Sequence, residues 1–170
     1  MTRITKGETN LISLYCLTEE QTQRLGFCLG ACLRPGDVVL LSGEMGAGKS
    51  VLARAAARGM GVEGPVPSPT FTIMNVHEGR DMRLYHFDLY RLEGADALYE
   101  MGLDEYIPAR DGASLIEWPQ MAEEAMPQCA LEIELSYGEN GEGRLANLTA
   151  LGGFDEARLG ALRDEWEAGK

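Results

Sequence analysis

Short apolar runs along the chain predict a set of buried β-strands. Residues 11–16, 37–42 and 113–117 form runs of five or six mostly apolar residues, and this length favours strands over helices. In residues 131–137, apolar side chains alternate with Glu and Ser, which predicts a strand with one exposed face. Residues 144–150 are predicted to pair back on that strand across a Gly-rich turn.

Apolar positions three and four residues apart predict the helices. Thr18 and Gln21 form a helix-capping pair, in which the Thr hydroxyl accepts from the backbone and the Gln side chain reaches back. The helix that follows is predicted to end before Pro35 and to bury Leu25, Leu29, Cys32 and Leu33. Further helices are predicted at residues 51–60 and 93–101, after Pro119 and near the C-terminus, with the inward side chains Leu98, Met101, Leu159, Leu162 and Trp166.

The order of these elements predicts a single α/β domain. Residues 73–76 and 82–88 flank a short polar turn and are expected to pair antiparallel, because a parallel pair needs a longer crossover. The central sheet is therefore expected to be mixed, mostly parallel and flanked by helices, with antiparallel hairpins. We assign residues 1–153 to this domain and expect a C-terminal helix within residues 154–170 to pack on it.

One motif carries candidate chemistry. Residues 43–50, Gly-Glu-Met-Gly-Ala-Gly-Lys-Ser, match the phosphate-binding loop of P-loop nucleotide hydrolases, between a predicted strand and a predicted helix. The glycines allow the backbone to curl around a phosphate and to turn N–H groups toward it, and the helix start adds its positive dipole. Lys49 is expected to reach the terminal phosphates and the Ser50 hydroxyl to bind Mg²⁺.

The motif is specific in this chain. Lysine occurs at only three positions, Lys6, Lys49 and Lys170, so the composition does not favour a lysine in the loop. At average residue frequencies the pattern would occur by chance in under ~1% of chains of this length. The alternative interpretation is a Gly-rich turn between strand and helix that binds nothing.

Two acidic residues end predicted buried strands and are candidates for the same site. Asp88 closes residues 84–88 and Glu117 closes residues 114–117. A P-loop enzyme needs an acid near its magnesium, so one of the two is expected to hold the metal, directly or through water. The other is expected to orient or deprotonate the attacking group. For each acid, a helix cap or a surface position is the open alternative.

Four further residues carry weaker signals. Thr70 lies in a Pro-bracketed loop, where switch segments sense the terminal phosphate in many such enzymes, and a strand-entry turn is the alternative. Glu19 opens the first helix, where the helix dipole favours an acid in any case. His86 and Trp118 flank the two acids and are expected to fill the core.

Composition narrows the function classes. A chain of 170 residues with 45% hydrophobic content suits one globular domain, and no apolar run approaches the roughly 20 residues of a membrane-spanning helix. Residues 1–7 lack the apolar core of a secretory signal, so we expect a cytoplasmic protein. The formal net charge of −12 argues against a general nucleic-acid-binding surface. The four cysteines form no Cys-x-x-Cys pair, and Cys28 and Cys32, four residues apart on a predicted helix, are expected to be buried and structural rather than metal ligands.

Four strings of the sequence together resemble the TsaE (YjeE-type) family. They are residues 43–50, Ser-Pro-Thr-Phe-Thr at 68–72, His-Phe-Asp-Leu-Tyr-Arg at 86–91 and Ile-Glu-Trp-Pro at 116–119. The resemblance implies a small bacterial cytoplasmic ATPase. Such proteins work with the TsaD and TsaB proteins to install threonylcarbamoyl on the adenosine beside the anticodon of tRNAs that read codons beginning with A. Contact with tRNA would be indirect or through that complex.

Carried over residue by residue, the resemblance implies ATP or ADP and Mg²⁺ as cofactors. Ser50 and Glu117 would be the Mg²⁺ ligands. Asp88 would be the acid at the hydrolytic centre, Thr70 a switch-like catalytic residue and Lys49 the catalytic lysine. The residues that contact the nucleotide would be Glu19, near its adenosine end, and Gly43, Glu44, Met45, Gly46, Ala47, Gly48, Lys49, Ser50 and Val51.

The loop departs from the usual form of the family at three positions. Glu44, Ser50 and Val51 stand where Asp, Thr and a second Thr are common. Because Ser keeps the hydroxyl and Glu keeps the charge, ATPase activity is still expected. Hydrolysis by the isolated protein is expected to be slow, since no Arg lies in the loop and phosphoryl transfer depends on cationic groups at the γ-phosphate.

Other function classes remain open at this point. A P-loop small-molecule kinase would also be small and single-domain, although it usually brings an Arg-rich lid, and no separate lid segment is evident. A GTPase is disfavoured, because none of the three lysines lies in an Asn-Lys-x-Asp motif. A nucleotide-dependent docking module whose hydrolysis is incidental is the non-enzymatic alternative.

Overall fold

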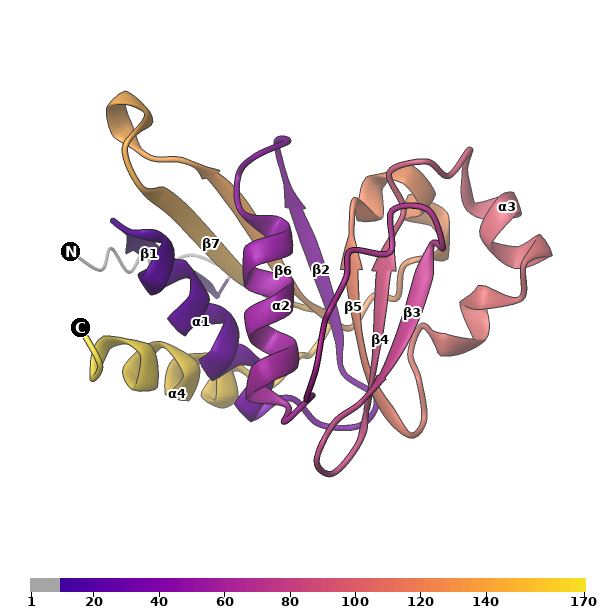
Figure 1. Cartoon of the computed structure of the whole chain (residues 1–170), viewed down its shortest axis with the longest axis horizontal. Coiled ribbons are helices and arrows are strands. Elements are labelled where there is room, and N and C mark those ends of the chain that lie inside the picture. Colours follow the sequence, from indigo (N-terminus) through magenta and orange to yellow (C-terminus); the bar gives the residue numbers. More distant parts are fainter. Residues whose placement is uncertain (1–9) are drawn as a thin grey trace.

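Within residues 10–170, the part of the chain that the structure describes, seven β-strands form one mixed sheet (Figure 1). The structure is a computed structural model, and residues 1–7, assessed above for a secretory signal, lie outside the described part. The strands follow the order β1-β7-β6-β2-β5-β4-β3 across the sheet. Their bounds are β1 (Leu11–Cys16), β2 (Val38–Gly43), β3 (Met74–Glu78), β4 (Arg83–Asp88), β5 (Gly112–Glu117), β6 (Ala130–Tyr137) and β7 (Arg144–Leu151).

Parallel pairing is confined to the centre of the sheet. β6, β2, β5 and β4 pair in parallel, whereas β3 joins β4, β7 joins β6 and β1 joins β7 antiparallel. The predicted hairpins β3–β4 and β6–β7 are both present. Three of the six pairings among the described strands are therefore parallel. The mixed sheet is confirmed, with its parallel part in the four central strands.

Helices cover both faces of this sheet. Their bounds are α1 (Glu19–Cys32), α2 (Lys49–Gly59), α3 (Ala95–Glu100) and α4 (Glu156–Glu167), with the short 3₁₀ helices η1 (Leu103–Tyr106), η2 (Pro119–Ala125) and η3 (Glu139–Gly141). Successive side chains of a strand point to opposite faces, so Val39 and Leu41 of β2 join the core under α1, α2 and α4. Val38 and Leu40 join a second core with α3 and η2.

Glycines set the close approach of α1 to α2. A Cβ atom at Gly30 would lie 1.9 Å from the carbonyl oxygen of Ala56, and one at Gly26 would lie 2.4 Å from that of Leu52. Both helices also carry buried apolar side chains at this contact, such as Leu25. Since no side chain fits between the two backbones, the glycines fix how closely α1 lies beside the helix that follows the 43–50 loop.

The C-terminal helix α4 closes the same face of the sheet. It buries the three side chains predicted to face inward, Leu159, Leu162 and Trp166. The Trp166 indole Nε1 donates to the backbone oxygen of Gln21 at 3.0 Å, and Arg158 pairs with Asp37 just before β2. The helix is thus tied both to α1 and to the start of the central strand.

Three local expectations are corrected in detail. Met101, expected to face inward, is 51% exposed, because α3 already ends at Glu100 and Met101 is only its C-terminal cap. The helix predicted at residues 51–60 begins two residues earlier, at Lys49. Thr18 caps α1 as predicted, but the Gln21 side chain accepts from the N–H of Leu17 rather than from that of the cap residue.

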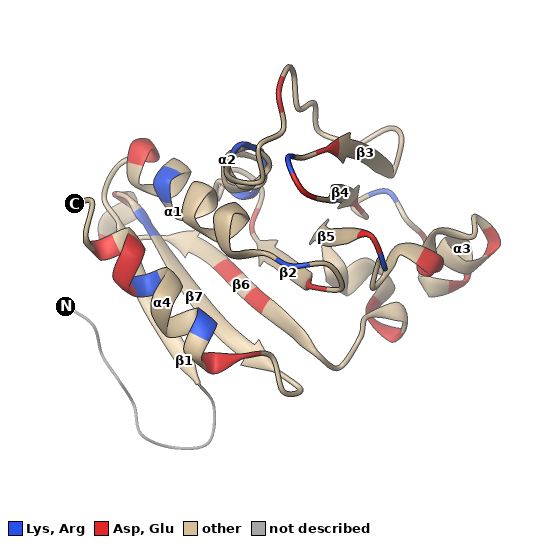
Figure 2. Cartoon of the chain, turned by 90° about the horizontal axis from the view of Figure 1, so that it is seen from below, with Lys and Arg blue, Asp and Glu red and all other residues tan. Residues whose placement is uncertain are grey.

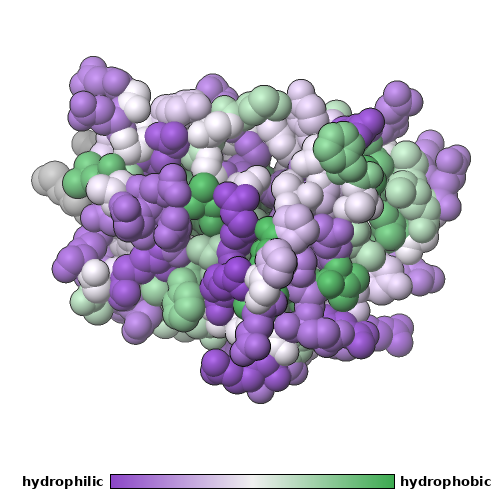
Figure 3. Space-filling model, in the orientation of Figure 1, coloured by the Kyte–Doolittle hydropathy of each residue, from purple (hydrophilic) through white to green (hydrophobic). Residues whose placement is uncertain are grey.

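Charged side chains occur on several of the helices and strands. Acidic residues lie on α1, α3, α4 and β6 and are more widespread than basic ones (Figure 2), in keeping with the net charge of −12. The face shown in Figure 3 is largely polar, with separate hydrophobic patches. None of the helices within residues 10–170 has the length and apolar character needed to cross a membrane.

The glycine contact between α1 and α2 can be tested directly. Gly30→Ala is expected to lower the free energy of unfolding by about 1–3 kcal/mol, because the new Cβ overlaps the backbone of Ala56. Gly160→Ala in α4 is the matched control: its Cβ meets nothing within 4 Å, and Ala is favoured over Gly in a helix. Urea unfolding of both variants decides the matter, and a Gly30→Ala protein as stable as the wild type would contradict this account of the packing.

Candidate functional site

Most of the buried polar side chains in the described chain gather at one edge of the sheet. Six such side chains are recorded within residues 10–170, and four of them, Lys49, His86, Asp88 and Glu117, are at most 6% exposed and lie together. Asp88 ends β4 and pairs in register with Glu117, which ends β5. The parallel centre of the sheet therefore brings the two predicted acids side by side, at the carboxyl ends of their strands.

The face on which these side chains lie follows from strand alternation. Leu84 and Leu115 belong to the core under α2, and residues two and four positions along the same strands share their face. His86, Asp88 and Glu117 are these residues, so all three point toward α2. Since Lys49 and Ser50 open α2, the folding of two strands and one helix is enough to assemble the site.

The 43–50 loop has the backbone conformation that its glycines predict. Gly43, Gly46 and Gly48 have φ angles of 140°, 81° and 105°, which side chains with a Cβ rarely adopt. At Gly43 a Cβ would also lie 2.2 Å from the carbonyl oxygen of Leu135 on β6. Helix α2 begins at Lys49, within the last residues of the loop. The first N–H groups of a helix have no partner within the helix. The loop and helix start thus form an anion-binding element.

The Lys49 ammonium is hydrogen-bonded to the backbone of its own loop. Its Nζ donates to the carbonyl oxygens of Gly43 and Glu44, at 2.7 and 2.8 Å, and lies 4.1 Å from the ring centroid of Trp118. Burial lowers the pKa of Lys49, while the charges of Glu117 and Asp88 act in the opposite direction. An ammonium has three N–H donors, so one remains for an oxygen of a bound phosphate.

A hydroxyl and a carboxylate meet beside the start of α2. The Ser50 Oγ donates to Glu117 Oε1 at 3.1 Å. The other carboxylate oxygen, Oε2, lies 3.1 Å from His86 Nε2, in a contact that is fully buried. The sequence predicted His86 and Trp118 as core-filling residues. His86 is indeed buried and Trp118 packs against the second core, but His86 also hydrogen-bonds the acid and Trp118 also lines the cavity described below.

Asp88 is held by the segment that carries Thr70. The Thr70 hydroxyl donates to Asp88 Oδ2 at 2.9 Å, and the Tyr90 N–H donates to Oδ1 at 3.0 Å. Ser68 lies 3.0 Å from Thr70 and extends the same network. The structure therefore brings the switch-like candidate to the acid predicted for the hydrolytic centre. Thr70 also lies in the turn of residues 70–72 that leads into β3, so the strand-entry alternative describes its backbone while its hydroxyl bonds Asp88.

These groups border one cavity of about 390 Å³. It is lined by Met45, Gly46, Gly48, Lys49, Ser50, Val51, Ser68, Thr70, Asp88, Tyr90, Glu117 and Trp118. A second cavity of about 300 Å³ lies on the other side of the loop and shares Gly46, Gly48 and Val51 with the first. Glu19 lines this second cavity together with Thr22 and Arg144. The loop therefore separates a side with two acids from a side that holds Glu19.

The β6–β7 hairpin hydrogen-bonds the outer side of the loop, and this contact was not predicted from the sequence. Arg144 donates to the carbonyl oxygens of Ala47 and Gly46, at 3.0 and 3.2 Å, and its guanidinium lies over the Tyr137 ring at 4.5 Å. The Tyr137 hydroxyl donates to Met45 O at 3.2 Å. Because the C=O and N–H of one peptide point in opposite directions, holding these oxygens outward turns the following N–H groups inward. No sequence signal links residues so far apart.

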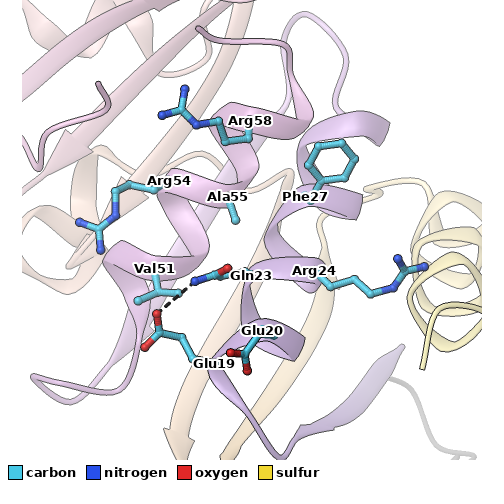
Figure 4. A pocket seen from close by; sticks show the side chains of 9 residues that line it. All are labelled: Glu19, Glu20, Gln23, Arg24, Phe27, Val51, Arg54, Ala55 and Arg58. Carbon is cyan, nitrogen blue, oxygen red and sulfur yellow. Dashed lines mark hydrogen bonds between the residues drawn. The ribbon is translucent and has the colours of Figure 1, made fainter. Parts of the chain in front are cut away.

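The two arginines that follow on α2 do not line the cavity beside Lys49. Arg54 and Arg58 border a groove of about 500 Å³ between α1 and α2, with Phe27 and Gln23 across from them. Their side chains point away from α1, as Figure 4 shows. Neither arginine is therefore a cation of the cavity beside Lys49.

The hairpin contact predicts how rigid the loop is. Arg144→Met removes two hydrogen bonds to loop carbonyls, each worth about 1 kcal/mol, so the Ala47 amide, which donates to Glu44 O at 3.1 Å, is expected to exchange with solvent about tenfold faster or more. Hydrogen exchange followed by NMR measures this rate. Arg54→Met, at the exposed groove, is the control and should leave the rate unchanged. Equal rates in wild type and Arg144→Met would remove the hairpin from the loop's support.

Known proteins with similar sequences match the part of the chain that carries this site. The sequence model of the family described as threonylcarbamoyl adenosine biosynthesis protein TsaE matches residues 16–145, which include the loop, both acids and Arg144. Three curated relatives carry the name tRNA threonylcarbamoyladenosine biosynthesis protein TsaE. That of Bacillus subtilis is 38% identical over 133 residues, with 78% of this chain and 82% of the relative covered. That of Nostoc is 35% identical, with 82% and 86% covered, and that of Mycobacterium bovis 40% identical, with 75% and 80% covered.

A solved structure extends the comparison to the fold. The crystal structure of Bacillus subtilis YdiB is 29% identical and superposes with a TM-score of 0.76, covering 96% of this chain and 99% of that one. The resemblance inferred from the four strings is confirmed by the family match and by the named relatives. The chain belongs to the TsaE family.

Proposed function

We propose that this protein binds ATP or ADP with Mg²⁺ on the 43–50 loop and hydrolyses ATP to ADP and phosphate. The observation that carries the proposal is the pair formed by Ser50 Oγ and Glu117 Oε1, 3.1 Å apart, at the helix start beside the buried Lys49. This arrangement places an anion-binding backbone, a lysine and two hard oxygen donors within one cavity.

The donor set fits Mg²⁺ held together with a nucleotide. Mg²⁺ prefers oxygen ligands and is usually bound by one or two carboxylates plus substrate phosphates and waters, rather than by an all-protein cage. Ser50 and Glu117 supply a hydroxyl and a carboxylate. No group of three or more His, Cys, Asp or Glu able to hold a metal occurs in residues 10–170, so the remaining ligands would have to be phosphate oxygens and waters. Bound there, Mg²⁺ would neutralise charge on the β- and γ-phosphates.

Asp88 has the position for the acid that handles the attacking water. Its Oδ1 is held by the Tyr90 N–H and its Oδ2 by the Thr70 hydroxyl, so the carboxylate is oriented toward the cavity edge where the γ-phosphate of a nucleotide on the loop would lie. A carboxylate oxygen there can orient the water and accept its proton. The Thr70 hydroxyl donates to Oδ2 of the same carboxylate. This hydrogen bond couples the segment after residue 67 to the reacting centre.

The isolated protein is proposed to turn ATP over slowly. Lys49 is the cation at the cavity, and the Arg144 guanidinium is engaged by loop carbonyls. Arg54 and Arg58 border the other groove. A cation supplied in trans can raise phosphoryl-transfer rates by roughly 10³–10⁵. We therefore assign completion of the site to a partner protein.

Membership of the TsaE family supports the biological setting of this activity. We infer that the chain is the ATP-hydrolysing subunit of the cytoplasmic system that installs threonylcarbamoyl on the adenosine next to the anticodon of tRNAs reading A-starting codons. TsaD-like and TsaB-like proteins are the proposed partners. The net charge of −12 suits contact with tRNA through such a complex rather than by this chain alone. The small-molecule kinase alternative finds no support among the named relatives.

Loss of the loop lysine tests nucleotide binding. Lys49→Ala is expected to weaken ADP binding about 10- to 100-fold, because a hydrogen bond to a charged group contributes about 1.5–3 kcal/mol. Calorimetric titration with ADP and Mg²⁺ measures the affinity, and circular dichroism checks the fold. Lys170→Ala, a lysine at the C-terminus, is the control. Unchanged ADP affinity in Lys49→Ala would refute the phosphate-loop assignment.

Partner dependence tests the proposed enzyme activity. Steady-state phosphate release by the isolated protein should be slow and should rise at least tenfold when the TsaD-like and TsaB-like proteins are added, since a trans cation alone supports far larger effects. Asp88→Asn should keep nucleotide affinity and lose about 10²–10⁴ of the stimulated rate. Fast turnover alone that the partners leave unchanged would contradict the model of an incomplete site.

A further inference from the structure

We propose that His86 is the positioning residue for Glu117, and that it sets how much Mg²⁺ strengthens nucleotide binding. This assignment rests on the proposed function, in which Glu117 and Ser50 hold the metal. It goes beyond that function because His86 does not line the cavity beside Lys49 and would act through the carboxylate alone.

The backbone brings the two side chains together across β4 and β5. In the parallel register His86 stands opposite Leu115, and Glu117 lies two residues further along the same face. Diagonal neighbours of this kind are within reach of long or ring side chains. The His86 Nε2 accordingly lies 3.1 Å from Glu117 Oε2, with the two side chains 1% and 2% exposed. Water therefore has almost no access to the contact.

The two carboxylate oxygens of Glu117 have separate partners. Oε1 accepts from the Ser50 hydroxyl and Oε2 contacts His86 Nε2. A carboxylate that holds a metal ion only accepts hydrogen bonds, so this assignment requires the His86 tautomer that carries its hydrogen on Nε2. The terminal torsion of a Glu side chain has broad preferences, and a free carboxylate would rotate. With Oε2 held by the ring, Oε1 stays directed at Ser50. Oε1 is the oxygen that would bind the metal beside the Ser50 hydroxyl, and its partner on the sheet side keeps it oriented.

No other side chain in residues 10–170 can replace this contact. Ser50 and His86 are the two side chains there that hydrogen-bond the Glu117 carboxylate. Lys49 is near enough to influence it electrostatically, but its Nζ donates to the loop carbonyls of Gly43 and Glu44. The orientation of the Glu117 carboxylate from the sheet side therefore depends on His86.

The surroundings of the ring argue against a purely structural role. His86 Nδ1 is buried and has no hydrogen-bond partner in the described residues, and an unsatisfied buried polar atom destabilises a fold. The bond to Glu117 is the directed interaction that the ring makes. His77, the other histidine of the chain, lies beside it with ring centroids 6.5 Å apart and has no recorded bond to Glu117.

The experiment compares nucleotide affinity with and without the metal. Wild type, His86→Ala, His86→Gln and His77→Ala are titrated calorimetrically with a non-hydrolysable ATP analogue, once with Mg²⁺ and once with EDTA. In His86→Ala the enhancement of affinity by Mg²⁺ should fall about 10- to 100-fold, the usual effect of removing a residue that orients a metal ligand. The affinity in EDTA should stay within about threefold of wild type, because the loop and Lys49 remain.

The variants separate positioning from packing. The Gln amide nitrogen reaches about as far as the imidazole Nε2, so His86→Gln should retain most of the Mg²⁺ enhancement. His86→Asn has the same amide on a shorter side chain and should lose the enhancement. If His86→Ala does not fold, as judged by circular dichroism, the Gln and Asn pair carries the comparison. His77→Ala should match the wild type in both conditions.

Specific outcomes overturn the assignment. An undiminished Mg²⁺ enhancement in His86→Ala or in His86→Asn would exclude His86 from positioning Glu117. Equal losses with Mg²⁺ and with EDTA would show that the ring only supports the fold. A wild-type protein that binds the analogue equally well with and without Mg²⁺ would instead contradict the proposed metal site itself, and this assignment with it.

Discussion

The structure depends on how three charged side chains are kept buried at one edge of the sheet. Lys49, Asp88 and Glu117 are each at most 6% exposed, and a buried charge is strongly destabilising unless it is hydrogen-bonded and compensated. Each has its own partners: loop carbonyls for the ammonium, Thr70 and the Tyr90 N–H for Asp88, Ser50 and His86 for Glu117. Meeting these requirements draws the ends of β2, β4 and β5 and the start of α2 into one arrangement.

The mixed topology separates two tasks of the sheet. The four parallel strands bring their carboxyl ends to the same edge, which is where open α/β sheets bind ligands, and β4 and β5 end there in the two acids. The antiparallel β6–β7 hairpin supplies no acid to the cavity beside Lys49. It reaches around the other side of the loop and holds three successive carbonyl oxygens through Tyr137 and Arg144. The acids thus come from β4 and β5, and the outer support of the loop comes from the β6–β7 hairpin, whose first strand also pairs in parallel with β2.

Features that neighbouring residues define could be predicted from the sequence. Contacts that depend on strand register and topology could not. The 43–50 loop, Ser50 and the two acids were predictable, because each is defined by its place at the end of a strand or the start of a helix. The hairpins and the inward side chains of α4 were predictable from periodicity for the same reason. The bond of His86 to Glu117 was not predicted, because it depends on the exact β4–β5 register. Arg144 was missed because it is almost 100 residues from the carbonyls that it holds. Met101 was misplaced because a six-residue helix ends one residue before it.

The way the cations are used suggests how the site is regulated. Lys49 and Arg144 direct five recorded hydrogen bonds between them to backbone carbonyls at and beside the loop, so much of their donor capacity stabilises the binding element itself. The acids, in contrast, line the cavity with at least one hydrogen-bond partner on each carboxylate oxygen. Under the proposed function, such a site binds phosphate and holds a divalent cation through Glu117, while the charge needed at the γ-phosphate comes from elsewhere. Thr70 connects Asp88 to the long segment that precedes β3. If Asp88 is the hydrolytic acid, as proposed, a protein that contacts this segment acts on that acid without touching the loop. The proposal thus assigns nucleotide binding and hydrolysis to different parts of the chain, so that a partner controls hydrolysis without changing binding.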